Sequence, residues 1–381
     1  MGLMNEYLDK HLTVDGLRSE LQELIKKYNK TTGHFLLVYA PDFSKADYPI
    51  SLEMQDYFII DDILPRRPKC DYLDFYIETP GGSGEAAEAI ADLLHDKYRE
   101  VNFIIAGEAK SAGTILALSG NNIIMTETGS LGPINAQCRI GRGWVSADDY
   151  MTWVKEKMAA KELTPFEAMM VAQISPGELY GIQNSLEYAK DLVLKWLPKY
   201  KFKNWIKTET RRINVTKDLK QNRAKEIANA LTDHKRWRSH GRSLNRNELN
   251  KIKLNIDEVQ DKEVLDIIRR IQTVLRLLFS SSSIYKVFST SENRIMKLAT
   301  PANPIVEQPP IVPFEVICPK CSKQYKMYVE WGDNRQAKEE IEAQGFIKIP
   351  DNLKIDCDCG NQIDLAPVKN EIEAKTGRKV L

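Results

Sequence analysis

Apolar and polar positions follow two different periods in the first third of the chain. Between residues 13 and 29 the apolar residues recur every three or four positions, which predicts an amphipathic helix that Thr13 can cap. Strands are predicted at 34–40, 72–77, 101–105 and 122–126, and helices at 55–64, 85–98 and 111–119. Because strands and helices alternate, the pattern predicts parallel strands joined by right-handed crossover helices, which is an α/β fold.

Beyond residue 146 the pattern becomes mainly helical. It predicts helices at 147–161, 165–173 and 177–197, the last ended by Pro198, and an amphipathic helix at 257–279. Five prolines between Thr300 and Pro313 then predict an extended linker. The predicted organisation is an N-terminal helix at 1–30, a main domain at 31–298, a Pro-rich linker at 299–314, a small module at 315–367 and a tail at 368–381.

Two Gly-rich turns follow predicted strands. Glu78-Thr-Pro-Gly-Gly-Ser-Gly84 comes after strand 72–77, and Gly107-Glu-Ala-Lys-Ser-Ala-Gly-Thr114 comes after strand 101–105. A serine at a strand-to-helix turn, here Ser111, holds its hydroxyl in the open beside backbone amides. Hydrolases need this combination of nucleophile and oxyanion donors. The structural alternatives are an ordinary helix N-cap for the serine and a plain tight turn for the glycines.

Four motifs in a fixed order resemble the Clp/crotonase superfamily, and within it the serine dehydrogenase proteinase family, relatives of signal peptide peptidase A and ClpP. They span about two thirds of the chain and read Thr79-Pro-Gly-Gly82, Ala109-Lys-Ser-Ala-Gly-Thr114, Ser130-Leu-Gly-Pro-Ile-Asn-Ala-Gln137 and Arg236-Trp-Arg-Ser-His-Gly-Arg-Ser-Leu244. The resemblance implies a ClpP/crotonase-like stacked ββα spiral core with helical additions. It also implies that Ser111 is a nucleophile and that the Gly82 and Ala112 amides hold the oxyanion. The turn containing Gly81 would hold an extended substrate strand.

The general base is not fixed by this resemblance. In ClpP a histidine follows the serine, but the corresponding segment here reads Gly132-Pro-Ile-Asn-Ala136 and contains none. Its Asn135 is expected to hold the turn. Relatives of signal peptide peptidase A use a lysine further along, in a window that holds Lys155, Lys157 and Lys161. A lysine base must be neutral near pH 7, which requires desolvation; otherwise these are surface lysines of an amphipathic helix.

His240, in the fourth motif, is the other candidate for the base. Its segment corresponds to the one that begins with the third triad member in ClpP, and an imidazole suits base chemistry without special tuning. The alternative is a loop histidine that satisfies a backbone carbonyl. His234, six residues earlier, is a less suitable substitute.

Four cysteines near the C-terminus predict a metal site. Cys318-Pro-Lys-Cys321 and Cys357-Asp-Cys359 carry thiols at a spacing that suits tetrahedral zinc. A redox dithiol is the alternative, but it does not account for four cysteines. Apolar residues before each pair predict the strands of a zinc ribbon, and a module this small needs the metal for its stability. The sequence does not show whether such a module binds protein, binds nucleic acid or only stabilises itself.

Composition and charge exclude several classes of protein. The chain is 43% apolar and 28% charged with a net charge of +1, which provides no overall attraction to nucleic acid or to anionic membranes. No apolar run is long enough for a transmembrane helix, no signal-peptide pattern begins the chain, and the six cysteines do not form a disulfide framework. The expected location is the cytoplasm. Residues 199–246 are basic, so nucleic acid is a possible partner, but a solvated helix face is favoured.

The motifs together predict a cytoplasmic serine peptidase with an appended zinc-ribbon-like module. The substrate would be a protein or peptide bound as an extended strand. The resemblance also implies a homo-oligomer with the site near an interface. Two alternatives stay open at this point. One is a crotonase-type enzyme acting on an acyl-CoA thioester, and the other is a non-catalytic scaffold, which the missing ClpP histidine keeps open.

Overall fold

The computed structural model describes residues 2–134, 137–140, 143–160, 162–208, 210–239, 241–299, 311–331 and 335–376. The chain divides into two compact units, Met1–Ala299 and Thr300–Leu381. The helices before residue 33 belong to the first unit, and the first strand of the second unit begins at Ile311. Most of the predicted linker lies outside the described residues, and the domain boundaries drawn from the sequence stay predictions.

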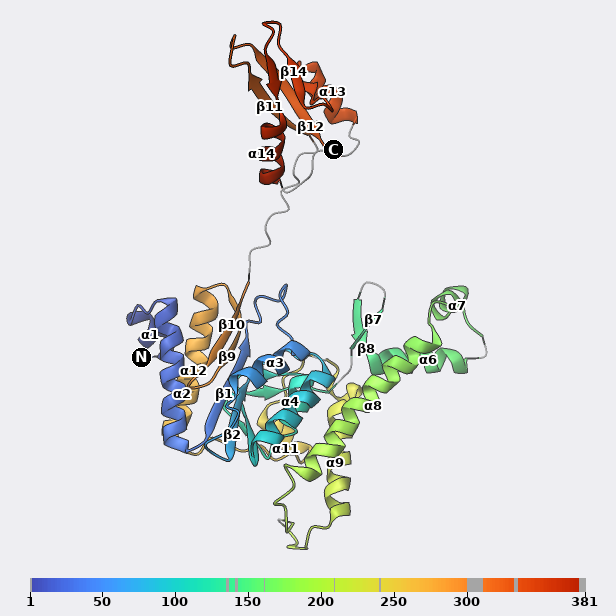
Figure 1. Ribbon diagram of the computed structural model, residues 1–381. Coiled ribbons are helices and arrows are strands. Elements are labelled where there is room, and N and C mark those ends of the chain that lie inside the picture. The colour runs from blue at the N-terminus through green and yellow to red at the C-terminus, as the bar shows by residue number, and fades with distance from the viewer. Residues whose placement is uncertain are drawn as a thin grey trace. The chain divides into compact units, whose positions relative to one another are not determined.

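A six-stranded sheet forms the centre of the first unit, in the order β10-β9-β1-β2-β3-β5 (Figure 1). Neighbouring strands among β1, β2, β3 and β5 pair in parallel, which confirms the predicted α/β class, whereas β9 pairs antiparallel to both β1 and β10. The sequence pattern did not predict β9 and β10. The strands are β1 (Phe35–Pro41), β2 (Tyr72–Ile77), β3 (Glu100–Ile105), β5 (Asn122–Met125), β9 (Ile284–Ser289) and β10 (Arg294–Leu298).

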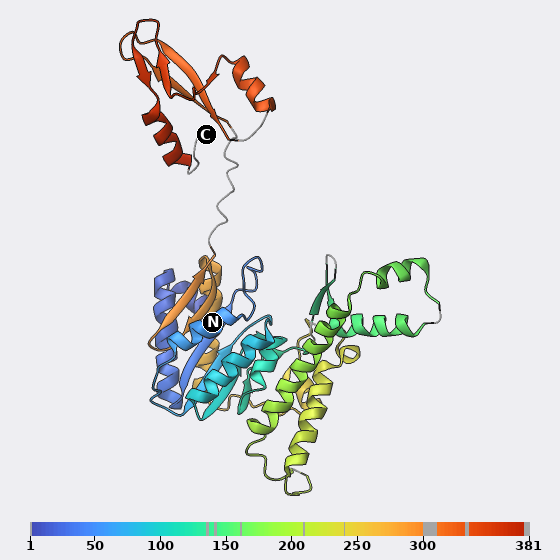
Figure 2. The same cartoon turned by 45° about the vertical axis from the view of Figure 1, so that its right-hand side comes forward.

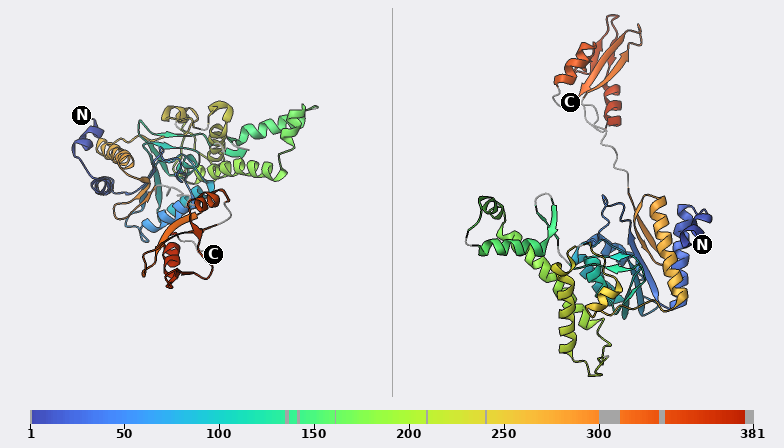
Figure 3. Two further views of the ribbon diagram at one scale, coloured as in Figure 1. Left: turned by 90° about the horizontal axis from the view of Figure 1, so that it is seen from above. Right: turned by 180° about the vertical axis from the view of Figure 1, so that it is seen from behind.

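Helices cover both faces of this sheet. Successive side chains of a strand point to opposite faces, so an apolar strand presents apolar side chains on each face that a helix must cover. In β1, Leu36 and Val38 belong to the core under α2 (Val14–Thr32) and α12 (Lys262–Ser281). Leu37 belongs to the core on the other side, which includes α3 (Met54–Ile63) and α4 (Gly84–Lys97). Figures 1 and 3 show these two helical layers with the sheet between them. Strands β1, β2 and β3 are therefore buried on both faces, as their continuous apolar runs indicate.

Helix boundaries follow capping residues. The Thr13 side chain accepts a hydrogen bond from the Gly16 amide at the start of α2, as predicted. The predicted start of the last amphipathic helix at residue 257 is wrong. Asp257 pairs with β5 instead, and the helix begins after Asp261, whose side chain caps it. Pro198 does not end its helix, which continues to Lys199.

The remaining elements of the first unit lie around the sheet. Helix α8 runs away from the sheet and, with α6 and α7, forms a helical arm (Figure 2). These elements are α1 (Leu3–Asp9), β4 (Glu108–Ala109), α5 (Ala112–Ala117), β6 (Ser130–Leu131), β7 (Gln137–Ile140), β8 (Gly143–Ser146), α6 (Ala147–Ala159), α7 (Pro165–Val171), α8 (Pro176–Lys199), α9 (Lys217–Thr232), α10 (His234–Trp237) and α11 (Arg246–Lys251). Among the described residues, no helix combines the length and apolar character needed to cross a membrane.

The second unit has a core of its own, built from Val316, Met327, Val329, Ile349 and Leu365 with the buried thiols of the cysteine cluster. Its small sheets and that cluster are consistent with the predicted zinc-ribbon-like class. The elements are β11 (Ile311–Ile317), β12 (Gln324–Glu330), α13 (Arg335–Ala343), β13 (Ile347–Lys348), β14 (Lys354–Asp356), β15 (Gln362–Asp364) and α14 (Ala366–Thr376).

Candidate active site

The two Gly-rich turns lie side by side, because β2 and β3 are parallel neighbours whose carboxyl ends meet at the same edge of the sheet. The Thr79 amide donates to the Glu108 carbonyl at 2.8 Å, and the Lys110 amide donates to the Thr79 carbonyl at 2.9 Å. A Cβ atom placed on Gly81 would lie only 2.8 Å from the Cβ of Ser111. The structure therefore brings Gly81 and Ser111 into contact.

Ser111 has a backbone conformation that glycine normally adopts. Its φ is 48° and its ψ is −114°, and the Gly113 amide closes the turn on the Lys110 carbonyl at 2.7 Å. This is the first central position of a type II′ turn, where a residue with a Cβ is strained by about 1–3 kcal/mol. Ser111 precedes α5, but its hydroxyl makes no capping hydrogen bond and has no hydrogen-bond partner among the described residues. The side chain is half-buried, so the hydroxyl stays available.

The turn around Gly82 is pressed against the backbone of Leu52. Gly82 has a φ of 145°, and a Cβ placed on it would lie 2.2 Å from the Leu52 carbonyl oxygen. The Leu52 amide donates to the Gly81 carbonyl at 2.7 Å, and the Ser83 amide donates to the Leu52 carbonyl at 2.9 Å. The amides of Gly82 and Ala112 donate to no acceptor in the part of the chain that the structure describes. Both remain free to bind an anionic oxygen.

Lys110, next to the serine, is a buried cation that the sequence interpretation did not use. Its ammonium group donates to the Ser243 hydroxyl at 2.7 Å and lies 3.6 Å from a Glu108 carboxylate oxygen. Burial lowers the pKa of Lys110. Among the described residues, no hydrogen bond joins the Lys110 and Ser111 side chains. Nothing in the sequence marks this lysine as buried, because the segments that enclose it come together only in the fold.

The predicted lysine bases lie on or after helix α6. Lys155 is exposed, and Lys157 forms an ion pair with Glu167 at 2.5 Å. Lys161 lies outside the described residues. A lysine can act as a base near neutral pH only where burial keeps it unprotonated, and the exposed position of Lys155 does not provide this condition.

The segment after α10 runs beside the serine turn. His240 and Asn135 lie outside the described residues, and His234 is described only in its backbone. Ser243 accepts a hydrogen bond from the Lys110 ammonium group, and Leu244 exchanges two backbone hydrogen bonds with Leu131, of 2.8 and 3.1 Å.

A buried carboxylate lies directly before the glycine turn. Glu78 is fully buried, accepts a hydrogen bond from the Tyr76 hydroxyl at 2.5 Å and pairs with Arg276 of α12 at 2.5 Å. A Cβ on Gly107 would lie 2.6 Å from its carboxyl carbon, so Glu78 contacts the start of the serine turn as well. Burial and the neighbouring carboxylate raise the pKa of Tyr76 well above its usual range. The sequence interpretation did not identify this contact.

A second polar network lies near the amino ends of the parallel strands. Buried Asp74 accepts hydrogen bonds from the Tyr28 hydroxyl at 2.6 Å and the Asn102 amide at 2.8 Å. The Nδ1 atom of His34 lies 2.9 Å from the same carboxylate, and this bond raises the pKa of His34. The network joins α2 to β2 and β3 at the end of the sheet opposite the serine turn.

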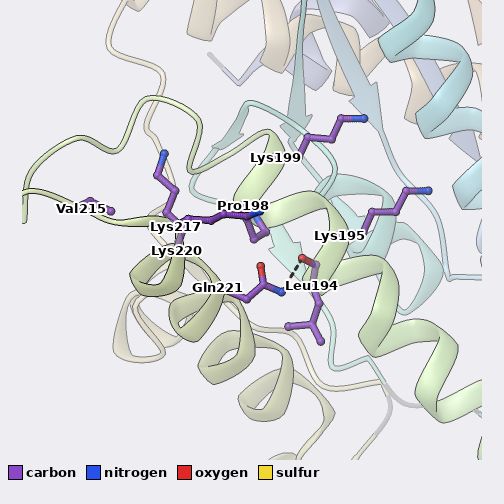
Figure 4. Close-up of a pocket in the computed structure, with 8 residues that line it drawn as sticks. All are labelled: Leu194, Lys195, Pro198, Lys199, Val215, Lys217, Lys220 and Gln221. Atoms are coloured by element: carbon purple, nitrogen blue, oxygen red, sulfur yellow. Dashed lines mark hydrogen bonds between the residues drawn. The ribbon is translucent and has the colours of Figure 1, made fainter.

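A groove of about 480 Å³ lies between α8 and α9, within the basic region (Figure 4). Lys195 is engaged by Glu88 at 2.8 Å, and Lys220 donates to the Lys203 carbonyl at 3.0 Å. In Figure 4 the amines of Lys195 and Lys199 point away from Lys217. The lysines do not converge on one anion, and none of the lining residues belongs to the two turns. They are Leu194, Lys195, Pro198, Lys199, Val215, Lys217, Lys220 and Gln221.

The four cysteines of the second unit form one cluster. Their sulfur atoms all lie within 4.8 Å of one another, with Cys318–Cys359 at 3.7 Å and Cys321–Cys357 at 3.4 Å. Tetrahedral zinc with bonds of about 2.3 Å places its sulfur ligands about 3.8 Å apart, so the cluster fits the metal. Each pair sits at the tip of a hairpin, β11–β12 or β14–β15. The structure brings together all four predicted ligands, which could hold a metal ion.

The comparisons with known proteins agree with the motif order. Residues 52–204 match the family model of the ClpP-like SDH-type serine proteinase. Two curated relatives are uncharacterized proteins of Methanocaldococcus jannaschii. MJ0137 is 28% identical over 52% of this chain, and MJ1495 is 37% identical over 17% of it. The matched segments span only 57% and 22% of those two proteins.

The solved structures to which this chain is similar share little of its sequence. Two structures of the 1510-N membrane-bound stomatin-specific protease are 14% and 16% identical, cover 58% and 56% of this chain and 79% and 74% of their own, and have a TM-score of 0.34. The ClpP protease catalytic domain from Plasmodium falciparum is 13% identical, with 55% and 77% coverage and a TM-score of 0.24. The resemblance inferred from the motifs is confirmed by the family model of the ClpP-like SDH-type serine proteinase, which matches residues 52–204.

Proposed function

We propose that the first unit is a serine peptidase that hydrolyses protein or peptide substrates. The observation that carries the proposal is the geometry at Ser111. A hydroxyl without a described partner stands on a strained turn in contact with Gly81, near the unengaged amides of Gly82 and Ala112. The Ser111 oxygen would attack the scissile carbonyl, and the two amides would hold the oxyanion. Gly81 and the adjacent turn would hold the substrate as an extended strand.

We propose His240 as the base. Ser243, three residues further along the chain, accepts a hydrogen bond from Lys110, whereas Lys155 is exposed and Lys157 is paired with Glu167. His240 would take the proton of the serine hydroxyl and later pass it to the leaving amine. The variant His240→Ala should react with an active-site probe at least 100-fold more slowly, the usual scale of general-base catalysis, while Lys155→Met should react at the wild-type rate. The reverse result would transfer the role to the lysine.

Covalent labelling tests the peptidase proposal directly. The full-length, zinc-loaded protein is treated with a fluorophosphonate, and the modified residue is located by mass spectrometry. We expect one label on Ser111, none on Ser111→Ala, and undiminished labelling of Ser83→Ala. Ser83 is a suitable control because its hydroxyl belongs to the same region but is used to cap α4. Folded wild-type protein that takes up no label would exclude a serine nucleophile and favour the non-catalytic scaffold.

We also propose that the cysteine cluster holds a structural zinc ion and that the chain forms homo-oligomers in the cytoplasm. The four sulfur atoms have suitable separations, and the described cysteines are free thiols, which suits a reducing compartment. Self-association is supported by large apolar side chains exposed on α6, α7 and α8, which an interface would cover. These are Met158, Phe166, Met169, Met170 and Tyr180. Light scattering at several concentrations would reveal a monomer if this part is wrong.

A further inference from the structure

A fully buried ion pair lies close to the proposed oxyanion turn. Lys286 of β9 and Asp56 of α3 have no exposed surface, and the ammonium nitrogen lies 3.1 and 3.0 Å from the two carboxylate oxygens. The Tyr39 hydroxyl donates to the same carboxylate at 3.1 Å. Burial lowers the pKa of Lys286, as expected for a cation enclosed by protein. The pair is thus a closed polar unit inside an apolar core.

Stability alone does not explain such a pair. Moving two charges out of water costs several kcal/mol for each ion, and apolar residues of similar volume often give equal or greater stability. Removing only one partner is different, because it leaves a buried charge uncompensated. What the pair supplies instead is a fixed position for the backbone groups that it binds.

The pair holds the short segment from Ser51 to Glu53 at both ends. The Lys286 ammonium donates to the Ser51 carbonyl at 2.9 Å, and the Glu53 amide donates to the Asp56 carboxylate at 3.0 Å. Leu52 lies between these two anchored peptide groups and is fully buried. Its position is therefore set by the ion pair rather than by a regular strand or helix.

Leu52 in turn sets the position of the glycine turn. It exchanges two backbone hydrogen bonds with Gly81 and Ser83, and its backbone leaves no room for a Cβ on Gly82. We propose that the Lys286–Asp56 pair positions the oxyanion turn through Leu52. Lys286 and Asp56 are positioning residues in this arrangement, because both are fully buried and reach the turn only through the Ser51–Glu53 segment. The inference rests on the proposed peptidase function for its catalytic consequence, but not for its structural part.

Two variants and one matched control test the inference. In Lys286→Met/Asp56→Asn both charges are removed together, so no unpaired charge remains, and the amide can still accept from the Glu53 backbone. Tyr39→Phe removes one hydrogen bond to Asp56 and is the milder change. Tyr28→Phe is the control, because it likewise removes a buried tyrosine hydroxyl from a buried carboxylate, Asp74, at the opposite edge of the sheet.

Two measurements on the full-length proteins separate positioning from general destabilisation. Amide hydrogen exchange is followed in peptides covering residues 50–53 and 79–84, and the rate of fluorophosphonate labelling at Ser111 is compared with kcat and KM on a peptide. We expect the double variant to exchange at least tenfold faster in both peptides. Its labelling rate and kcat should fall about 10- to 100-fold with little change in KM, because small misplacements of catalytic groups cost factors of this size. Tyr39→Phe should show the same effects more weakly.

The control decides the interpretation. If Tyr28→Phe lowers Tm but leaves exchange at 50–53 and 79–84 and the labelling rate unchanged, the effect belongs to the pair. The inference is overturned if the folded double variant exchanges and labels like wild type, or if the control matches it in both measurements. Should the wild type itself take up no label, the peptidase proposal fails, and the exchange data alone still decide whether the pair positions the turn.

Discussion

The backbone of Ser111 stores strain at the residue proposed to carry the chemistry. A serine at φ 48° and ψ −114° is held there by the hydrogen bond between Gly113 and Lys110 and by contact with the glycine turn. Strained residues of this kind persist where the surrounding structure overrides the local preference, and they gather at active sites. The strain also keeps the hydroxyl away from the capping position that a helix-starting serine usually adopts.

Replacing Ser111 with glycine should therefore stabilise the protein while abolishing its activity. Glycine adopts this conformation without strain, and its greater freedom in the unfolded chain offsets only part of the gain, so we expect about 1 kcal/mol more stability. Urea unfolding of the folded variant measures this change. His11→Gly, at another positive φ of 46°, should gain stability without losing fluorophosphonate labelling. A Ser111→Gly protein less stable than wild type would contradict the strain.

Sequence patterns indicated some residues of the candidate site and not others, for a physical reason. Ser111, Gly81 and Gly82 carry local signals, because a serine next to a turn that requires glycine can be recognised from short motifs. Buried charges such as Lys110 and Lys286 carry no such signal. Each is an ordinary polar residue in the sequence and becomes informative only when distant segments enclose it.

At the level of elements, the strands and helices predicted between residues 13 and 126 agree with the structure because each has a continuous apolar run or a clear cap, whereas α1 and β4 were not predicted. Strands β9 and β10 were missed because they join the sheet from the far end of the chain, and their pairing with β1 is a long-range contact. The start of α12 was misplaced because Asp257 fits the helical period but is used to pair with β5. In both cases a contact between distant segments of the chain, rather than the local sequence pattern, determines the secondary structure.

The network that joins α2 to the strands should make stability depend on pH. The hydrogen bond to Asp74 raises the pKa of His34, so the native state binds the proton more tightly than the unfolded state does. The stabilisation is complete below the unfolded pKa of about 6.5 and is lost as pH rises through the higher folded pKa. Replacing His34 with glutamine should therefore cost more stability at pH 5.5 than at pH 9, measured by urea unfolding.

His95 provides a control of opposite sign. Burial lowers the pKa of His95, and its ring stacks on the ring of Tyr200 with the two ring centroids 3.5 Å apart. Here the unfolded state binds the proton more tightly. The contribution of neutral His95 to folding stability is therefore present above pH 6.5 and is lost as pH falls through the folded pKa. The cost of His95→Gln should be greater at pH 9 than at pH 5.5. Equal pH slopes for the two variants would contradict the assigned environments.

At the scale of the whole molecule, metal removal should unfold one unit and leave the other intact. The second unit is small, and four of its thiols converge on one point, so bound zinc would supply much of its stability. A strong chelator should abolish the protection of amides in 311–376 from exchange while leaving those of β1, β2 and β3 protected. Full protection of 311–376 in metal-free protein would contradict the structural role of zinc.

Elemental analysis provides the matched control for that experiment. Wild-type protein should carry about one zinc per chain. Cys318→Ser should lose the metal, because Cys318 is fully buried in the cluster. Cys70→Ser should retain the metal, since Cys70 lies in the first unit and its thiol donates a hydrogen bond to the Tyr72 carbonyl.

The separate apolar cores of the two units have an evolutionary consequence. The first unit encloses its own clusters of buried apolar side chains, and so does the second. Because each unit encloses a core of its own, gene fusion or loss could add, exchange or delete the smaller, cysteine-bearing unit as one piece. Homologues that share one unit and differ wholly in the other would be the natural product of such a history.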